Sequence, residues 1–382
     1  MRFVPGTEKI PLTRSTGRVL AEKVSADRDL PPFHRSTMDG IAISFSQYES
    51  GLREFVLEGT LAAGQPQSTL RSKHGCFEIM TGAVLPEGTD TVVRYEDITI
   101  ADGKAFVNGA VEKNQSVHRR GIDAMRDEVL LTEGTMISPA EVALLASVGK
   151  SELTVYSVKP VAIVSTGDEL VPVEATPERW QIRRSNGVAL SSALSMMHID
   201  SRIFHLPDEP VVLEKELRSI VDQHEIIILS GGVSKGKFDY VPVILEKLGI
   251  KKEFHQVRQR PGKPFWFGRS QTTTVFALPG NPVSTFLCFH RYIRPWIVSG
   301  LGMPSDKMHA AISTDFTFKP DLTYFLQVKI DTSGGLLSAT PDPGEGSGDF
   351  ANLRNVDGFI ELPAERSDFR KGEVFPFISF RK

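Results

Sequence analysis

The chain has very little cysteine and shows no feature of a secreted or membrane-spanning protein. Cys76 and Cys288 are the only cysteines among 382 residues. They form no CxxC pair and no disulfide framework, so we expect a reducing, cytoplasmic location. The first segment, MRFVPGTEKIPLTRSTGR, lacks the apolar stretch of a secretory signal. Because no run of about 18 apolar residues occurs, we also expect no membrane as a partner.

The sequence also lacks a strong charge imbalance and the common hydrolase and zinc motifs. Its formal net charge is −3, from 44 basic and 47 acidic side chains. This balance argues against a general binder of nucleic acid, which needs a basic surface. HExxH, GxSxG and clustered Cys/His are absent, so metalloprotease, serine hydrolase and zinc-site interpretations have no support.

The pattern of apolar and turn-forming residues changes near Lys159. Before it, short apolar segments between Gly and Pro predict a mostly β region, interrupted by one helix after Ser138. From Val161, strand-length apolar runs alternate with helical patterns, which predicts parallel strands in a layered α/β sheet. After Pro304 the pattern predicts strands again. The expected helices cover residues 187–198, 211–224, 240–249 and 281–300, and the main expected strands cover 161–165, 202–206, 225–229 and 272–279.

Three short polar loops follow three of these strands: STGDEL, SGGVSKGKFD and PGNPVS. In open α/β sheets, ligands bind beyond the carboxyl ends of the parallel strands. Glycine can serve a turn alone, but three such loops at one sheet edge favour a ligand crevice. Asp168 and Glu169 come directly after the first strand. Their oxygens could hold a divalent cation, or they could simply cap a turn or face solvent.

The second loop is close to a phosphate-binding P-loop. From Gly231 it reads G-G-V-S-K-G-K-F, and only the last position departs from G-x-x-x-x-G-K-[ST]. Phe238 stands where the magnesium-binding hydroxyl is required, which disfavours an NTPase. Glycines followed by a helix N-terminus still suit an anion. Lys235 and Lys237 could be solvated loop charges, and Asp239 could cap the helix or act on a ligand.

Several further residues carry weaker signals. Arg260 and Lys263 flank a Pro-Gly pair, and two cations at a stiff spacing suit an oxyanion, although a solvated hairpin tip is the plainer interpretation. In the β region, Asp39 and Thr81 each precede a glycine, and Asp123 follows HRRGI. Turn formation explains these three residues as well as function does.

Seven segments in order make the sequence resemble a known family. They are STMDGIA, IMTGAVLPEGTDTVV, RRGID, STGDEL, SGGVSKGKFDY, RPGKPFWFG and LPGNPVS. Together they resemble the molybdopterin molybdenumtransferases of the MoeA type and are similar to the E domain of gephyrin. The resemblance runs from about Thr7 to the last residues. It implies that the second loop contacts the phosphate of a pterin nucleotide, not a nucleoside triphosphate.

The resemblance implies a multidomain fold of the α/β plus β class. A layered α/β domain of the molybdopterin-binding type is joined to mostly β N-terminal domains and a C-terminal β domain. The implied reaction inserts molybdate-derived metal into adenylylated molybdopterin, releases AMP and uses Mg²⁺. The implied partners are a second copy of the chain and an upstream molybdopterin adenylyltransferase. The implied domains are residues 1–26 with 120–158 (domain I), 27–119 (domain II), 159–304 (domain III) and 305–382 (domain IV).

Carried over residue by residue, the resemblance implies three sets of site residues. The catalytic set is Asp39, Thr81, Asp123, Glu169, Asp208 and Asp239. The set that contacts cofactor and substrates is Ser230, Gly231, Gly232, Arg260, Lys263, Pro279, Gly280, Asn281, Pro282, Ser284 and Ser347. The implied magnesium ligands are Asp168, Glu169 and Asp239.

The implied anion pocket departs from the family pattern. The resemblance places arginine where Leu322 and Gln327 stand, and lysine where Arg260 stands. Losing a cation from a buried anion site costs on the order of 2–5 kcal/mol, unless Lys319 or Arg354 takes its place. Two alternatives therefore stay open beside an active insertase: a non-catalytic molybdopterin-binding scaffold, and an insertase that prefers tungstate.

Overall fold

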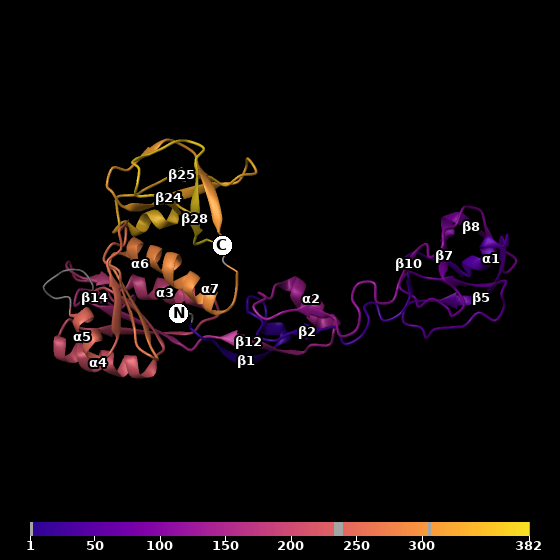
Figure 1. Cartoon of the computed structure of the whole chain (residues 1–382), viewed down its shortest axis with the longest axis horizontal. Helices are drawn as coiled ribbons and strands as arrows, with labels where there is room; N and C mark the ends of the chain where they lie inside the picture. Colours follow the sequence, from indigo (N-terminus) through magenta and orange to yellow (C-terminus); the bar gives the residue numbers. More distant parts are fainter. Residues whose placement is uncertain (1–2, 233–239, 305–306, 382) are drawn as a thin grey trace. The chain divides into compact units, whose positions relative to one another are not determined.

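The computed structural model describes residues 3–232, 240–304 and 307–381. The chain divides into two compact units. In Figure 1 the colours follow the sequence from the N-terminus to the C-terminus. Within the described part, no helix has both the length and the apolar character that a membrane crossing requires. The first unit comprises Met1–Ala21, Glu133–Ser138 and Leu153–Lys382, and the second comprises Glu22–Thr132 and Pro139–Glu152. The finer division into four domains stays a prediction.

The second unit is mostly β, as its turn-rich sequence predicts. Its main sheet has the strand order β7-β4-β6-β5-β9-β8, and Ile41, Phe55 and Val93 are fully buried in its core. The helix predicted after Ser138 is α2 (Pro139–Ser147), which begins at Pro139. The other elements are β2 (Val24–Ser25), β3 (Arg35–Ser36), β4 (Gly40–Ile43), α1 (Phe45–Glu49), β5 (Glu54–Leu61), β6 (Gly75–Ile79), β7 (Thr91–Arg94), η2 (Tyr95–Asp97), β8 (Ile98–Ala101), β9 (Lys104–Val107), β10 (Val117–His118) and β11 (Val129–Leu131).

The first unit contains a six-stranded α/β sheet with the order β16-β13-β17-β21-β20-β18. The four strands from β16 to β21 pair in parallel, which confirms the layered α/β prediction. The strands β20 and β18 pair antiparallel instead, because no helix connects β18, β20 and β21. The strands are β13 (Val161–Thr166), β16 (Ser201–Leu206), β17 (Ile226–Ser230), β18 (Lys251–His255), β20 (Trp266–Arg269) and β21 (Thr274–Leu278).

Helices cover both faces of this sheet. Along β13, Val161 and Ile163 belong to one apolar core, while Ala162 and Val164 belong to the core on the opposite face. Burial on both faces explains why the strands read as continuous apolar runs. Figure 1 shows α4 and α5 on one side of the strands and α3, α6 and α7 on the other. The helices are α3 (Ser185–Ser195), α4 (Pro210–Gln223), α5 (Val241–Lys247), α6 (Pro282–Cys288) and α7 (Arg294–Gly300).

The long helix predicted over 281–300 is not one regular α-helix. A π-helical turn, Phe289–Ile293, separates α6 from α7. Pro295 has no N–H to donate, and its ring crowds the carbonyl one turn earlier. The π turn directly before it accommodates this mismatch. The predicted extent is therefore right and the predicted continuity is wrong.

The C-terminal part of the first unit is a closed ring of five strands, in the order β24-β25-β22-β28-β26 with β26 pairing back to β24. Leu326 and Ile360 are fully buried in its core. The short β19, which begins the basic loop, pairs with β24 and so ties that loop to the ring. The elements are β19 (Gln259–Arg260), β22 (Met308–Ile312), β23 (Phe316–Thr317), β24 (Thr323–Asp331), β25 (Ser338–Pro341), η4 (Phe350–Arg354), β26 (Gly358–Leu362), β27 (Asp368–Phe369) and β28 (Val374–Ser379).

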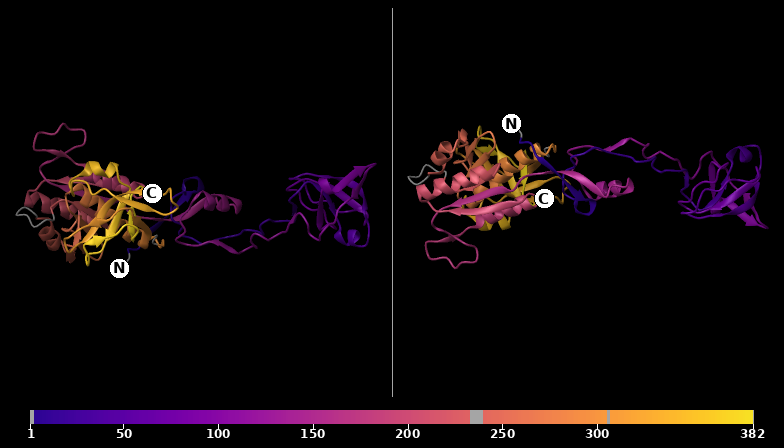
Figure 2. Two further views of the ribbon diagram at one scale, coloured as in Figure 1. Left: turned by 90° about the horizontal axis from the view of Figure 1, so that it is seen from above. Right: turned by 90° about the horizontal axis from the view of Figure 1, so that it is seen from below.

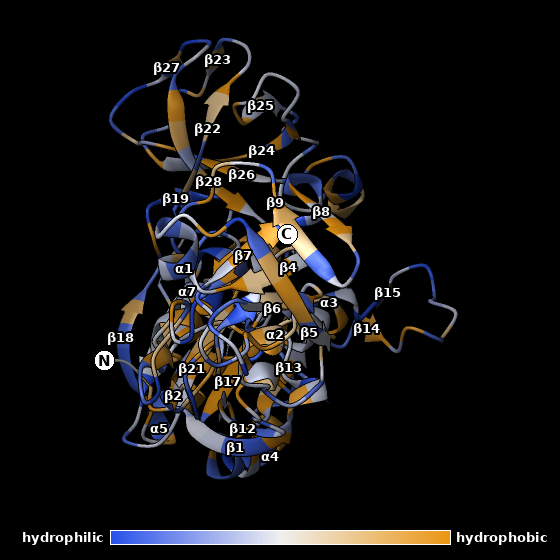
Figure 3. Ribbon diagram, turned by 90° about the vertical axis from the view of Figure 1, so that its right-hand side faces the viewer, coloured by the Kyte–Doolittle hydropathy of each residue, from blue (hydrophilic) through white to orange (hydrophobic). Residues whose placement is uncertain are grey.

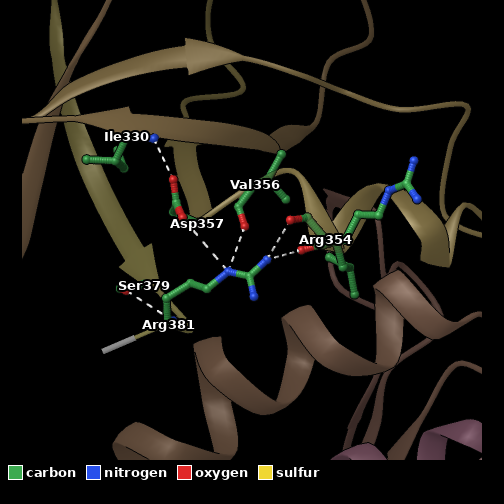
Figure 4. Close-up of polar contacts among 7 residues, drawn as sticks. Ile330, Arg354, Val356, Asp357, Ser379 and Arg381 are labelled. Atoms are coloured by element: carbon green, nitrogen blue, oxygen red, sulfur yellow. Dashed lines mark hydrogen bonds and ion pairs between the residues drawn. The ribbon is translucent and has the colours of Figure 1, made fainter.

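Arg381 fastens the turn η4 to the end of the ring (Figure 4). Its guanidinium donates to the carbonyl oxygens of Leu353 at 2.6 Å, Arg354 at 3.0 Å and Val356 at 3.1 Å. Asp357 lies 3.8 Å from the same guanidinium. These contacts fix the turn at the end of the glycine-rich segment PDPGEGSGDF, residues 341–350.

The remaining elements of the first unit are short. Between β14 and β15 the chain stands out from the α/β domain, as Figure 2 and Figure 3 show. This segment begins directly after the STGDEL loop and returns to the sheet at the start of α3. The elements are β1 (Gly6–Pro11), η1 (Leu12–Arg14), β12 (Glu152–Ser157), β14 (Leu170–Val171) and β15 (Ile182–Arg183).

Candidate functional site

The carboxyl ends of β13, β17 and β21 open into a cavity of about 470 Å³, named here the first cavity. This volume is within the range of small-molecule sites. The loops after all three strands line it, so the predicted crevice at this sheet edge is confirmed. Of the predicted site residues, Glu169, Asp208, Ser230, Gly231, Gly232, Pro279, Gly280, Asn281 and Pro282 line the first cavity.

Gly231 allows the strand ends to approach one another closely. Its φ is +101°, in the region that favours glycine. A Cβ on Gly231 would lie 3.1 Å from both the carbonyl oxygen and the hydroxyl of Thr166. The Gly231 N–H donates to the carbonyl oxygen of Leu278 at 3.1 Å. The ends of β13, β17 and β21 therefore meet through backbone, and a ligand can approach that backbone directly.

Two carboxylates, Glu169 and Asp208, line the first cavity. The neighbouring Asp168 accepts a hydrogen bond from the Asp208 N–H at 3.3 Å, which joins the two loops. Residues 3–232, 240–304 and 307–381 contain no group of three or more His, Cys, Asp or Glu side chains that could hold a metal. The third predicted ligand, Asp239, lies outside the described residues, as do Lys235, Lys237 and Phe238.

Four consecutive polar or charged residues that line the first cavity were missed by sequence reasoning: Arg183, Arg184, Ser185 and Asn186. The helix α3 begins at Ser185, two residues before the expected start. The signal was the run RRSNG, in which cations and small polar residues precede an apolar helical pattern. The Arg184 guanidinium has no hydrogen-bond or ion-pair partner in the described part of the chain. Together with the N-terminus of α3 it makes this end of the cavity favourable for an anion.

A second cavity of about 550 Å³ lies between the basic loop, the start of α6 and the C-terminal ring. Its charged lining residues within the described chain are Arg260, Lys263 and Glu345. Two cations against one carboxylate leave a positive balance, which suits an oxyanion. Of the predicted site residues, Arg260, Lys263, Pro279, Asn281, Ser284 and Ser347 line the second cavity.

Buried contacts fix the loop that carries the two cations. A Cβ on Gly262 would lie 2.8 Å from Sγ of Cys288, so the loop packs tightly against α6. The buried Gln259 donates from Nε2 to the carbonyl oxygen of Pro261 at 3.0 Å. The hydroxyl of Tyr292 donates to Oε1 of the same glutamine. Arg260 and Lys263 are therefore presented on a rigid support.

The second cavity contains the residues that depart from the family pattern. Leu322 and Gln327 both line it, whereas Lys319 and Arg354 do not. The suggestion that one of these two cations takes the place of an arginine is therefore not supported. Tyr324 also lines the cavity, and burial raises the pKa of its phenol. It keeps its proton at neutral pH and can donate a hydrogen bond to an anion.

The two cavities adjoin. Pro264, Pro279 and Asn281 line both of them. Nδ2 of Asn281 donates to the hydroxyl of Ser347 at 3.0 Å, which ties the PGNPVS loop to the C-terminal ring. The PGNPVS loop is therefore the wall between the cavities.

The remaining predicted residues lie in the other unit. Asp39 accepts hydrogen bonds from the backbone N–H of Thr81 at 2.6 Å and from its hydroxyl at 2.8 Å. These two bonds lower the pKa of the Asp39 carboxyl, the backbone bond having the larger effect. Asp123 contacts His118 instead, at 2.9 Å between Oδ1 and Nε2. The structure thus brings Asp39 and Thr81 together and places Asp123 in a separate pair.

Comparison with family models divides the chain into three matched regions. Residues 2–149 match the MoeA N-terminal region (domain I and II). Residues 162–298 match a probable molybdopterin binding domain. Residues 309–380 match the MoeA C-terminal region (domain IV).

Curated relatives and a solved structure agree with these matches. The chain is 39% identical to a molybdopterin molybdenumtransferase of Synechocystis sp., over 98% of this chain and 95% of that protein. It is 35% identical to a molybdopterin molybdenumtransferase of Haemophilus influenzae, over 77% of this chain and 73% of that protein. The structure is similar to that of a molybdopterin biosynthesis MoeA protein from Pyrococcus horikoshii, with a TM-score of 0.85, 27% identity and coverage of 100% and 96%.

Proposed function

The chain belongs to the MoeA family of molybdopterin molybdenumtransferases, and from that premise we propose how its two cavities divide the reaction. It is a multidomain enzyme of molybdenum cofactor biosynthesis. The first cavity binds the phosphate end of adenylylated molybdopterin, and the second binds molybdate. The reaction places the metal at the dithiolene of molybdopterin and releases AMP.

The observation that carries this proposal is the shared wall between two unlike cavities. One cavity is built from glycine backbone and a helix N-terminus, and the other contains the two cations Arg260 and Lys263. The first chemistry suits a phosphate group and the second suits a free oxyanion. Because Pro279 and Asn281 line both, groups bound on the two sides lie next to each other. A transfer between a nucleotide-bearing substrate and an oxyanion needs this adjacency.

The carboxylates of the first cavity have a proposed role with Mg²⁺. Glu169 and Asp208 repel a phosphate bound beside them, and a divalent cation between the carboxylates and the phosphate would remove this repulsion. Mg²⁺ is commonly held by one or two carboxylates together with substrate phosphates and water. Glu169 and Asp208, the two carboxylates that line the cavity, are therefore the described side chains that could hold this ion together with phosphate and water. Asp168 and Asp239 are further proposed ligands. When bound, Mg²⁺ would stabilise the negative charge on the departing phosphate.

The cations of the second cavity have a proposed role in holding the molybdate dianion. Arg260 and Lys263 supply the charge, and the hydroxyls of Ser284 and Ser347 supply hydrogen-bond donors. Leu322 and Gln327 reduce the cationic charge relative to the expected family pattern. The names of the relatives nevertheless favour the molybdenum enzyme, and neither the scaffold nor the tungstate-preferring alternative is favoured.

The wider assembly remains part of the proposal. Asp39, Thr81 and Asp123 are proposed to act in the same reaction, although they belong to the other unit of the chain. A homodimer and an upstream molybdopterin adenylyltransferase are the proposed partners, and domains I to IV are the proposed division of the chain. Support for these points comes from the family resemblance.

The function is tested by incubating the purified chain with adenylylated molybdopterin, Mg²⁺ and molybdate. We expect AMP release that depends on molybdate, together with formation of the metal-containing cofactor. Sulfate at the same concentration is the control for a general salt effect. The absence of both products in the presence of every component would contradict the proposed function.

A further inference from the structure

The amide of Asn186 connects three segments of the site. Its Nδ2 lies 2.9 Å from the hydroxyl of Ser230, 2.7 Å from the carbonyl oxygen of Gly280 and 3.3 Å from the hydroxyl of Thr285. These partners lie at the end of β17, in the PGNPVS loop and in α6. From this geometry we infer that Asn186 is a positioning residue that holds the wall between the two cavities. The inference rests on the proposed function.

The chemistry of the partners fixes the orientation of this amide. The Gly280 carbonyl oxygen can only accept a hydrogen bond, so the NH₂ end of Asn186 must face it. Ser230 and Thr285 are almost completely buried. The Thr285 hydroxyl also contacts the carbonyl oxygens of Pro279 at 2.5 Å and Asn281 at 3.2 Å. The wall is therefore held by one buried hydrogen-bond cluster, and Asn186 joins that cluster to the helix α3.

A displacement of the wall would change both cavities at once. A Cβ on Gly280 would lie 3.6 Å from the Cα of Gly231, so the wall packs directly on the glycine loop of the first cavity. On its other side, Asn281 bonds to Ser347 in the second cavity. A misplacement of reacting groups by about 1 Å can reduce a rate on the order of 100-fold. Asn186 thus affects the relative placement of the two bound groups more than the binding of either.

The test separates placement from binding. In Asn186→Ala and Asn186→Asp, three quantities are measured: the affinity for AMP, the affinity for molybdate, and kcat for molybdate-dependent AMP release. We expect kcat to fall by roughly 10- to 100-fold, with each affinity changed by less than about threefold. Asn186→Asp should be the more affected, because it places a carboxylate oxygen against the Gly280 carbonyl oxygen. Both variants should keep a cooperative melting transition.

The matched control is Ser191→Ala on the same helix. Ser191 accepts a hydrogen bond from the Ser201 hydroxyl at 2.8 Å and lines neither cavity. It should leave kcat unchanged. An unchanged kcat in both Asn186 variants would overturn the inference, and so would a loss of both affinities in parallel with the melting temperature. The native protein is assayed first. If it releases no AMP in response to molybdate, the proposed function is refuted, and the Asn186 variants are not needed to show this.

Discussion

The two adjoining cavities are built in different ways. The first cavity is shaped by backbone at the ends of parallel strands, which Gly231 allows to meet, and its charged side chains are Glu169, Arg183, Arg184 and Asp208. Side chains from the basic loop, α6 and the C-terminal ring shape the second, with Arg260 and Lys263 as its cations. Backbone geometry is determined by the sheet, whereas side-chain identity at a loop is not. The difference implies that substitutions in the second cavity alter ligand preference, while substitutions in the first disturb the fold as well.

The largest expected effect comes from Lys263→Ala in the second cavity. Removing a charged hydrogen-bond donor costs about 1.5–3 kcal/mol, so molybdate should bind roughly 10- to 100-fold more weakly. Calorimetric titration with molybdate measures this loss, and a parallel titration with AMP should show no change. The control is Lys252→Ala, an exposed lysine of β18 that pairs with Glu246 at 3.0 Å. If Lys263→Ala weakened AMP binding as much as molybdate binding, the proposal that the two ligands occupy different cavities would be contradicted.

Gly231→Ala should show the dual effect expected of the first cavity. At φ +101°, an alanine is strained by about 1–3 kcal/mol, and its Cβ would press on Thr166 at 3.1 Å. We expect a lower melting temperature and roughly tenfold weaker AMP binding. Gly249→Ala is the matched control, since Gly249 has φ +83° and nothing within 4 Å of its Cβ. Gly249→Ala should lower the melting temperature without weakening AMP binding. If Gly249→Ala weakens AMP binding as much as Gly231→Ala does, the contact with Thr166 is not the cause.

A third prediction concerns a buried histidine directly after α6. His290 follows α6, is 8% exposed and lies against Phe286 and Phe289, and neither ring nitrogen has a hydrogen-bond partner in the described chain. Burial lowers the pKa of His290 from 6.5 to about 3. Between these two pH values, His290 therefore binds a proton in the unfolded chain but not in the folded chain. Stability should fall as pH falls through this window, by about 1.4 kcal/mol per unit at most.

His290→Leu should remove this contribution. Chemical denaturation between pH 7 and pH 4 should show a shallower loss of stability than the native chain shows. His74→Leu, at an exposed position in the other unit, is the control for removing a histidine. The same pH slope in the native chain and in His290→Leu would show that His290 is not the group responsible.

The smallest expected effect is at Asp39 in the other unit. Thr81→Val removes the hydroxyl bond and keeps the larger backbone bond, so the pKa of Asp39 should rise only part of the way to 3.8. A chemical-shift titration of the carboxyl carbon measures this change. Thr60→Val is the control, because its hydroxyl contacts Glu78 at 2.9 Å. If the titration of Asp39 is the same in Thr81→Val as in the native chain, the hydroxyl bond is not formed in solution.

The comparison of the cavities also explains how much the sequence could predict. Strand and helix alternation after Val161 predicts parallel strands, and a general rule then places three loops at one edge. The first cavity follows from this without any relative. Asn186 was missed because helix starts are uncertain by one or two residues, and the expected helix began at Gly187.

The second cavity could not be derived from local patterns. Its residues come from segments near Arg260, Ser284, Tyr324 and Ser347, which only the folded chain brings together. No periodicity relates a hairpin loop to a glycine-rich turn about 85 residues later, so family resemblance was the only source of this prediction. The antiparallel pairing of β18 and β20 and the π turn before Pro295 were also not predicted, although connections without a helix and Pro295 itself were local signals for them.

The most direct test of the two-cavity account is a calorimetric titration of molybdate into the native chain, with and without saturating AMP and Mg²⁺. The account predicts saturable molybdate binding in both cases, because the two ligands occupy neighbouring cavities and can be bound together. Simple competition, in which saturating AMP abolishes molybdate binding, would place both anions in one cavity and contradict the central claim.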